Sequence, residues 1–323
     1  MKQETLDGKT NEKTPKEIMQ ESIDLGLKEF YVAYSGGKDS GIALDFMAKE
    51  FPQYFKGVVF VNTGIGTDAT INFVENYCKE RGYTLYHLHA EDVKRKIDTH
   101  VGKKGEPFDF EHLVMAYGFP QQPLHTVTMR WLKMFSLRQF IFERIAKGEN
   151  PAIVSGIRKN ESARRKTKAK KYIYNDGKMW FVSPLYFKSN EWVYEYFVKE
   201  DIKRSPCYET LHISGDCLCG CFAQENELEL LKMFHPEVYD KIKKLEMKLK
   251  TCGTDDAKKH ATWGIHDQTT IESDDETEGY VCNDCFFDRD GKEKDTKRFN
   301  DEMEEIEKNW RRWVELDAYK LAS

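Results

Sequence analysis

The loop Ser35-Gly36-Gly37-Lys38-Asp39-Ser40 constrains the fold more than any other feature of the sequence. Residues 30–34 before it are aromatic and β-branched, as in a buried strand, and residues 41–51 after it carry apolar side chains at helical spacing. Adjacent glycines let backbone N–H groups approach an anion closely, and the positive end of the following helix points at the same place. The order of strand, loop and helix therefore predicts a phosphate-binding site.

The polar side chains of this loop also suit a phosphate. Ser35 and Ser40 supply hydroxyl donors, Lys38 supplies a point charge, and Asp39 either orders the loop or helps to hold Mg²⁺ beside a triphosphate. The Walker spacing of glycine and lysine is absent. A tight glycine turn with a solvated lysine would explain a bare Gly-Gly pair, but it does not explain all six residues. We therefore take all six as candidate nucleotide-binding residues.

Apolar patterns predict the rest of a sheet. Further strands are expected at residues 57–62, 83–88, 152–155 and 179–182. The helices between them are expected at residues 69–81 and 131–147. Strands that alternate with helices form a mostly parallel sheet with helices on both faces, and ligands bind beyond the carboxyl ends of its strands. We expect an α/β fold, a Rossmann-like three-layer sandwich with a mostly parallel five-stranded sheet and a small cysteine-rich C-terminal region.

Three parts of the chain differ in composition. Residues 1–14 are polar and are expected to form a flexible N-terminus, residues 15–205 the nucleotide-binding domain, and residues 206–323 a cysteine-rich, metal-binding helical region. Thr14 and Glu17 have the spacing of a capping box, which predicts that the first helix begins directly after Thr14.

Composition and charge exclude several classes of protein. The chain is 40% hydrophobic and 33% charged, as in a folded protein, and its net charge of −5 excludes a chain that as a whole binds nucleic acid electrostatically. No segment approaches the roughly 18 apolar residues of a membrane span, and the polar N-terminus does not resemble a secretory signal. We therefore expect a cytoplasmic protein without a membrane partner.

The cysteines cluster in the C-terminal third of the chain. In a reducing compartment they are expected to be metal ligands or reactive thiols rather than disulfides. The candidate ligands of a four-sulfur metal site are Cys217, Cys219, Cys282 and Cys285. Cys207 and Cys221 are alternatives, each either a fourth ligand or a free thiol that handles sulfur. Spacing does not separate zinc from a 4Fe–4S cluster, and unlinked reduced thiols are the remaining interpretation.

The phosphate loop resembles that of the PP-loop adenine nucleotide α-hydrolase-like superfamily. Later segments resemble, in the same order, the phosphoadenosine phosphosulfate reductase-like family within it. These segments are Val61-Asn62-Thr63-Gly64, Arg130-Trp131-Leu132-Lys133, Gly156-Ile157-Arg158 with Glu161-Ser162 and Arg164, and Pro184 to Tyr208. The resemblance implies that Thr63, Gly64, Gly156 and Arg158 contact an adenine nucleotide, either ATP or a sulfonucleotide. It also implies that Lys133 and Arg164 act in catalysis by stabilising charge on the leaving nucleotide.

A basic run from Arg158 to Lys171 has three interpretations. Its arginines suit bidentate phosphate contacts, its lysines could attract a nucleic acid, and the run could equally be a solvated loop. His125, eight residues before Lys133, is either a structural histidine or an acid–base group.

Two departures from the family keep the reaction open. The Glu-Cys-Gly-Leu-His segment of assimilatory reductases is absent, and the sequence closes with residues 317–323 instead. The Cys-Cys pair of iron–sulfur members is also absent, and Thr128 stands where relatives often have cysteine. Sulfonucleotide reduction, with a thioredoxin-like thiol donor, is the first hypothesis. The second is an ATP pyrophosphatase and sulfurtransferase that adenylates and thiolates a nucleic acid or small molecule within a sulfur-transfer complex. The third is a non-catalytic nucleotide-binding adaptor with a metal staple.

Overall fold

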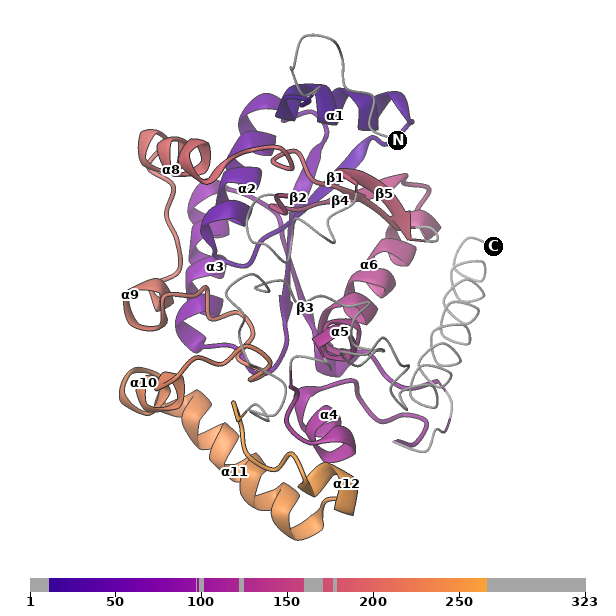
Figure 1. Ribbon diagram of the computed structural model, residues 1–323. Helices are drawn as coiled ribbons and strands as arrows, with labels where there is room; N and C mark the ends of the chain where they lie inside the picture. The colour runs from indigo at the N-terminus through magenta and orange to yellow at the C-terminus, as the bar shows by residue number, and fades with distance from the viewer. Residues whose placement is uncertain are drawn as a thin grey trace, which may run out of the picture.

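A six-stranded sheet lies at the centre of the protein, with the strand order β3-β2-β1-β4-β6-β5 (Figure 1). The computed structural model describes residues 12–96, 98, 102–121, 125–159, 171–176 and 179–265. The strands are β1 (Glu29–Ala33), β2 (Phe55–Asn62), β3 (Leu85–His89), β4 (Pro151–Val154), β5 (Ile173–Asp176) and β6 (Met179–Val182). All neighbours are parallel except β5 and β6, so the mostly parallel sheet is confirmed.

The edge strand β5 was not among the predicted strands. It pairs antiparallel with β6, from Ile173 opposite Val182 to Asp176 opposite Met179. Ile173 and Tyr174 favour strands, but Asn175 and Asp176 are depleted in them, and the segment has only four residues. Pairing with β6 therefore completes a strand that its own sequence marks only weakly.

Helices cover both faces of the sheet, which confirms the three-layer Rossmann-like sandwich. The helices α1 (Pro15–Asp24), α2 (Lys38–Glu50) and α3 (Asp68–Arg81) pack on one face. The helix α6 (Phe135–Ala146) packs on the other face (Figure 1). Side chains alternate along β1, so Phe30 and Val32 face α2 while Tyr31 faces α6.

A third core forms where the C-terminal helices meet the carboxyl end of the sheet. The C-terminal helices are α10 (Glu227–Phe234), α11 (Pro236–Cys252) and α12 (Asp255–Lys258), and α4 (Phe110–Tyr117) packs against them. The core joins Trp131 to Leu218 and Trp263, and the Trp263 indole N–H donates to the Leu218 carbonyl at 2.9 Å. The predicted boundary at residue 205 is thus bridged by one continuous apolar cluster.

The segment that carries Lys133 is a π-helical turn, η3 (Arg130–Met134), between α5 (His125–Met129) and α6. Turns of this kind inside α-helices occur often at functional sites. The structure also describes the helix α8 (Asn190–Lys199) and the short elements η1 (Ala90–Asp92) and α9 (Cys207–Leu211). In the part of the chain that the structure describes, no helix combines the length and apolar character needed to cross a membrane.

The capping box of α1 offers a test of local stability. Thr14 Oγ1 accepts from the Glu17 N–H at 3.3 Å, and Glu17 Oε2 accepts from the Thr14 N–H at 2.6 Å. Removing such a cap costs about 1 kcal/mol, so Thr14→Ala should lower the free energy of unfolding in urea by that amount. Thr14→Ser keeps the hydroxyl and should remain close to the parent. Equal losses in both variants would show that the threonine methyl, and not the cap, stabilises the helix.

Candidate functional site

The phosphate loop, residues 35–40, joins β1 to α2 in a closed turn. Gly36 has a φ of +75°, a conformation that disfavours residues with a Cβ. Ser40 Oγ accepts from the Ser35 N–H at 3.3 Å and donates to the Gly37 carbonyl at 3.1 Å. The positive end of α2 begins at Lys38, directly after this turn. The predicted strand, anion loop and helix are therefore all present.

Gly156 lets the segment after β4 lie against the phosphate loop. A Cβ at this position would lie 2.5 Å from the Asp39 carbonyl carbon and 2.7 Å from the Ser40 nitrogen. On the opposite side, the Ser205 N–H donates to the Gly36 carbonyl at 2.8 Å. The close approach of Gly156 and the hydrogen bond from Ser205 thus both hold the phosphate loop, independently of a ligand.

Arg158 is buried and already engaged with the protein. Its Nε donates to Asp39 Oδ1 at 2.6 Å, and its Nη1 donates to Asn190 Oδ1 at 2.9 Å. These bonds tie the phosphate loop to the first turn of α8 and support the loop-ordering role for Asp39. Direct contact of Arg158 with a nucleotide stays a prediction, and Arg164 lies outside the described residues.

Lys133 forms an ion pair that the sequence did not predict. Its Nζ lies 2.5 Å from Asp216 Oδ2, and the Ser214 hydroxyl donates to the other Asp216 oxygen at 2.6 Å. Burial lowers the pKa of Lys133, but the Asp216 carboxylate and the Cys217 sulfur outweigh it, so the pKa is raised. Burial raises the pKa of Asp216, but the lysine outweighs it, so that pKa is lowered. Both groups are therefore charged at neutral pH.

The segment around Asp216 lies against the phosphate loop and the end of β2. Ser214 Cβ lies 3.6 Å from where a Cβ on Gly37 would be. The Thr63 hydroxyl donates to the Asp216 carbonyl at 3.2 Å, and the Leu218 N–H donates to the Ile65 carbonyl at 2.8 Å. The segment from Ser214 to Leu218 is consequently fixed at the carboxyl end of the sheet, where parallel α/β sheets bind ligands.

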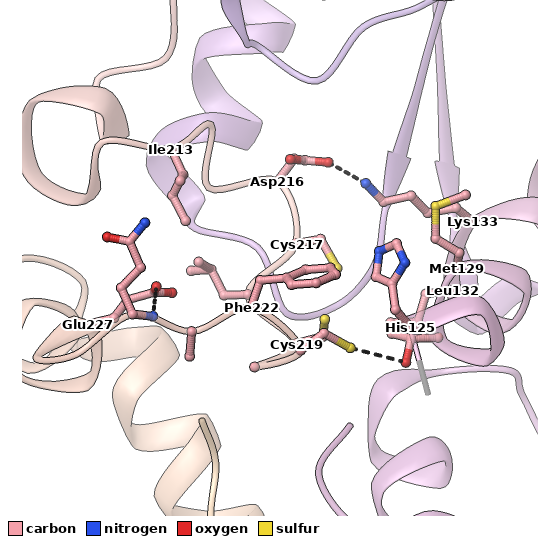
Figure 2. A pocket seen from close by; sticks show the side chains of 16 residues that line it. His125, Met129, Leu132, Lys133, Ile213, Asp216, Cys217, Cys219, Phe222 and Glu227 are labelled. Carbon is pink, nitrogen blue, oxygen red and sulfur yellow. Dashed lines mark hydrogen bonds and ion pairs between the residues drawn. The ribbon is translucent and has the colours of Figure 1, made fainter. Parts of the chain in front are cut away.

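Three cysteines line a cavity of about 250 Å³ beside this ion pair (Figure 2). Cys217 is partly exposed, whereas Cys219 and Cys221 are buried. The Cys219 thiol interacts with the thiols of Cys217 and Cys221, and Cys221 Sγ donates to Thr128 Oγ1 at 3.7 Å. The hydrogen bond to Cys219 and burial raise the pKa of Cys217, while Lys133 acts in the opposite direction. The cavity, also lined by His125, therefore holds a chain of thiols next to an ammonium group.

Of the four predicted metal ligands, the structure places two. Cys217 and Cys219 lie together, while Cys282 and Cys285 lie outside the described residues. Cys207 is in a different environment, 2.8 Å from Thr67 Oγ1. Within the ranges that the structure describes, no three histidine, cysteine or acidic side chains are placed to hold a metal ion. The metal site stays a prediction.

Thr63 and Gly64 line a second cavity, of about 430 Å³, at the carboxyl ends of β2 and β3. Thr63 itself is fully buried, and the Gly64 carbonyl accepts a hydrogen bond from the Lys241 ammonium. Asp68 and Glu237 also line this cavity, which is therefore rich in carboxylates. The two residues predicted to lie near adenosine thus border an open space next to the Asp216 segment.

Sequence reasoning missed Asp216, Ser214 and Tyr208. The Lys38 N–H donates to the Tyr208 hydroxyl, which places α9 over the start of α2. Asp216 is the sole acidic residue between Leu211 and Ala223 in the sequence, and it directly precedes the three cysteines. A half-buried lysine such as Lys133 needs an opposite charge nearby. The position of Asp216 as the sole acidic residue beside the cysteines was therefore the available signal that it is the partner.

The fold and loop define an α/β protein with a phosphate loop of the nucleotide-binding type. The family model of the phosphoadenosine phosphosulfate reductase domain matches residues 29–222, well over half of the chain. The chain therefore belongs to the phosphoadenosine phosphosulfate reductase domain family. The match covers the phosphate loop, Lys133, Arg158 and all three cysteines of the cavity.

Individual proteins show weaker similarity. An uncharacterised protein of Methanocaldococcus jannaschii is 28% identical over 225 residues, which are 66% of this chain and 40% of that protein. The chain thus spans less than half the length of this curated relative. Phosphoadenylyl-sulfate reductase from Candida auris has a TM-score of 0.42 at 15% identity, covering 61% of this chain and 85% of that one. The U34-tRNA thiolase NcsA from Methanococcus maripaludis, solved with its 4Fe–4S cluster, has a TM-score of 0.38 at 17% identity, covering 73% and 78%.

Removing the charge of Asp216 should destabilise the protein at neutral pH. A hydrogen bond to a charged group contributes about 1.5–3 kcal/mol, so Asp216→Asn should lower the free energy of unfolding by that amount at pH 7. The lowered native pKa means that the contribution is present above the pKa of an unfolded aspartate, about 3.9, and is lost as pH falls through the native pKa. Urea unfolding of both proteins between acidic and neutral pH measures this. A difference that does not shrink at acidic pH would refute the ion pair as its cause.

Proposed function

We propose that the chain binds an adenylyl sulfonucleotide at the phosphate loop and reduces it by thiol attack on its sulfur atom, releasing sulfite. One observation carries the proposal: the segment that bears the thiols packs on the phosphate loop. Ser214 Cβ lies 3.6 Å from where a Cβ on Gly37 would be, and Cys217 follows three residues later, a span of at most about 10 Å in an extended chain. Nucleotide phosphates and a sulfur nucleophile would therefore meet in one site.

The residues around the loop fit distinct roles in this reaction. Lys38 makes no ion pair with another described residue, and with the N-terminus of α2 it would hold the nucleotide phosphates. Asp39 and Arg158 keep the loop in shape. Lys133, with Arg164, would stabilise the negative charge that develops on the leaving nucleotide. Thr63 and Gly64 would border the nucleoside.

ATP-dependent thiolation is the second candidate, because the cavity holds more thiols than a single attack needs. Thiolation would use Mg²⁺, a sulfur-carrying thiol or a metal centre, zinc or 4Fe–4S, at Cys217, Cys219, Cys282 and Cys285, and a nucleic acid or small-molecule acceptor. The bond from Arg158 to Asp39 weighs against Asp39 as a Mg²⁺ ligand. Reduction would instead need a thioredoxin-like donor to restore the thiols.

Ligand-dependent stabilisation separates the candidates. We expect adenosine phosphosulfate or its 3′-phosphorylated form to raise the melting temperature more than ATP does, since a ligand stabilises according to its affinity for the folded state. Sulfite release in the presence of a dithiol should accompany that shift. Selective stabilisation by ATP with pyrophosphate release would favour thiolation. Binding without either product would favour the non-catalytic adaptor.

Lys38→Ala should weaken nucleotide binding without unfolding the protein. Loss of one charged contact to phosphate corresponds to roughly tenfold to a hundredfold in Kd. Lys28→Ala, an exposed lysine ahead of β1, is the matched control and should bind like the parent. Isothermal titration with the preferred nucleotide measures both. Unchanged affinity in the Lys38 variant would remove the phosphate loop from the proposed site.

A further inference from the structure

The thiols in the cavity differ in exposure and in contacts. Cys217 is partly exposed, Cys219 is 8% exposed, and Cys221 is fully buried. The ammonium of Lys133 interacts electrostatically with Cys217 and Cys219. Figure 2 shows Cys217 and Cys219 in the same cavity, with Lys133 turned toward Asp216. The partly exposed thiol of Cys217 and the buried thiol of Cys219 therefore both interact with the Lys133 ammonium.

We propose that Cys217 and Cys219 form an internal dithiol in which Cys217 attacks the sulfonucleotide and Cys219 displaces sulfite. The assignment rests on the proposed reduction and identifies the residues that supply its electrons. Cys217 is the nucleophile because it is the more exposed of the two thiols and interacts electrostatically with the Lys133 ammonium. Cys219 is the resolving thiol because it stands two residues from Cys217, lines the same cavity and interacts with the Cys217 thiol.

The backbone between the two cysteines is fixed. The Leu218 N–H donates to the Ile65 carbonyl at 2.8 Å, and its carbonyl accepts from Trp263 Nε1 at 2.9 Å. Residues two apart have Cα atoms at most about 7 Å from each other, and disulfides usually span about 4.4–6.8 Å between Cα atoms. The sequence separation therefore places the two cysteines within the range in which a disulfide can form.

The two steps balance in atoms and electrons. In the first, the Cys217 thiolate attacks sulfur, a S–S bond forms, the S–O bond to the phosphate breaks, and the nucleotide leaves with the electron pair. In the second, the Cys219 thiolate attacks Cys217 Sγ, a disulfide forms, and sulfite leaves. The dithiol loses two electrons and the sulfonate gains them. The Lys133 ammonium would stabilise each thiolate in turn, and an external dithiol would regenerate the pair.

A single-turnover experiment on the full chain tests the assignment. The protein is reduced, freed of reductant without oxygen, and mixed with the sulfonucleotide that it binds. The parent should release stoichiometric sulfite with loss of two thiols, and peptide mapping should link Cys217 to Cys219. Cys219→Ser should release no sulfite and retain one SO₃ group on Cys217. Cys217→Ser should do neither, while Cys252→Ser, an exposed cysteine at the end of α11, should behave like the parent.

Failure of the dithiol and failure of the proposed function give different results. If the parent with excess dithiothreitol releases no sulfite from any sulfonucleotide, the proposed reduction is wrong. If it does turn over, but Cys217→Ser keeps its activity or the mapped disulfide joins other cysteines, only the dithiol assignment is overturned. Stoichiometric zinc or iron that is lost in Cys217→Ser and Cys219→Ser would also overturn it. Disulfide mapping of the parent does not depend on the folding of any variant.

Discussion

The ion pair between Lys133 and Asp216 joins two parts of the chain that the sheet alone would leave apart. Lys133 comes from the π-helical turn before α6, and Asp216 from the segment before the cysteines. A half-buried pair gains little over solvated charges unless further hydrogen bonds support it. Ser214 supplies such a bond to the carboxylate, and Thr63 fixes the same residue through its backbone. The pair therefore sets where the thiols lie relative to the phosphate loop.

The phosphate loop itself is shaped before any ligand arrives. Gly156 lies against its backbone, Arg158 holds Asp39, and Ser205 bonds to the Gly36 carbonyl. Preorganised donors bind an anion without a further ordering cost, which is the advantage of a rigid anion site. Because Ser205 and Tyr208 belong to the same stretch as the cysteine segment, the loop and the thiols form one structural unit.

Features that depend on local sequence could be predicted, and features that depend on distant contacts could not. The capping box at Thr14 and the anion loop at Ser35 to Ser40 use residues a few positions apart, so their spacing was sufficient. The edge strand β5 is a local feature that was nonetheless missed: it pairs with β6 directly after it, and Asp176-Gly177 has a sequence typical of hairpin turns. Asp216 gains its role from a lysine 83 residues away, which no spacing rule connects. Likewise, spacing showed that Cys217, Cys219 and Cys221 were close, but not which thiol is exposed.

The two site lysines differ in what they can offer an anionic ligand. The charge of Lys133 is largely balanced by Asp216 at 2.5 Å, so a nucleotide phosphate would compete with a carboxylate already in place. Lys38 makes no ion pair with another residue in the described part of the chain, and it stands at the positive end of α2. A phosphate should therefore prefer Lys38, while Lys133 is held near the thiols by the same carboxylate that weakens it as an anion ligand. The ion pair in this way keeps Lys133 beside the thiols, where the bond to the leaving nucleotide would break, and leaves Lys38 to bind the nucleotide phosphates.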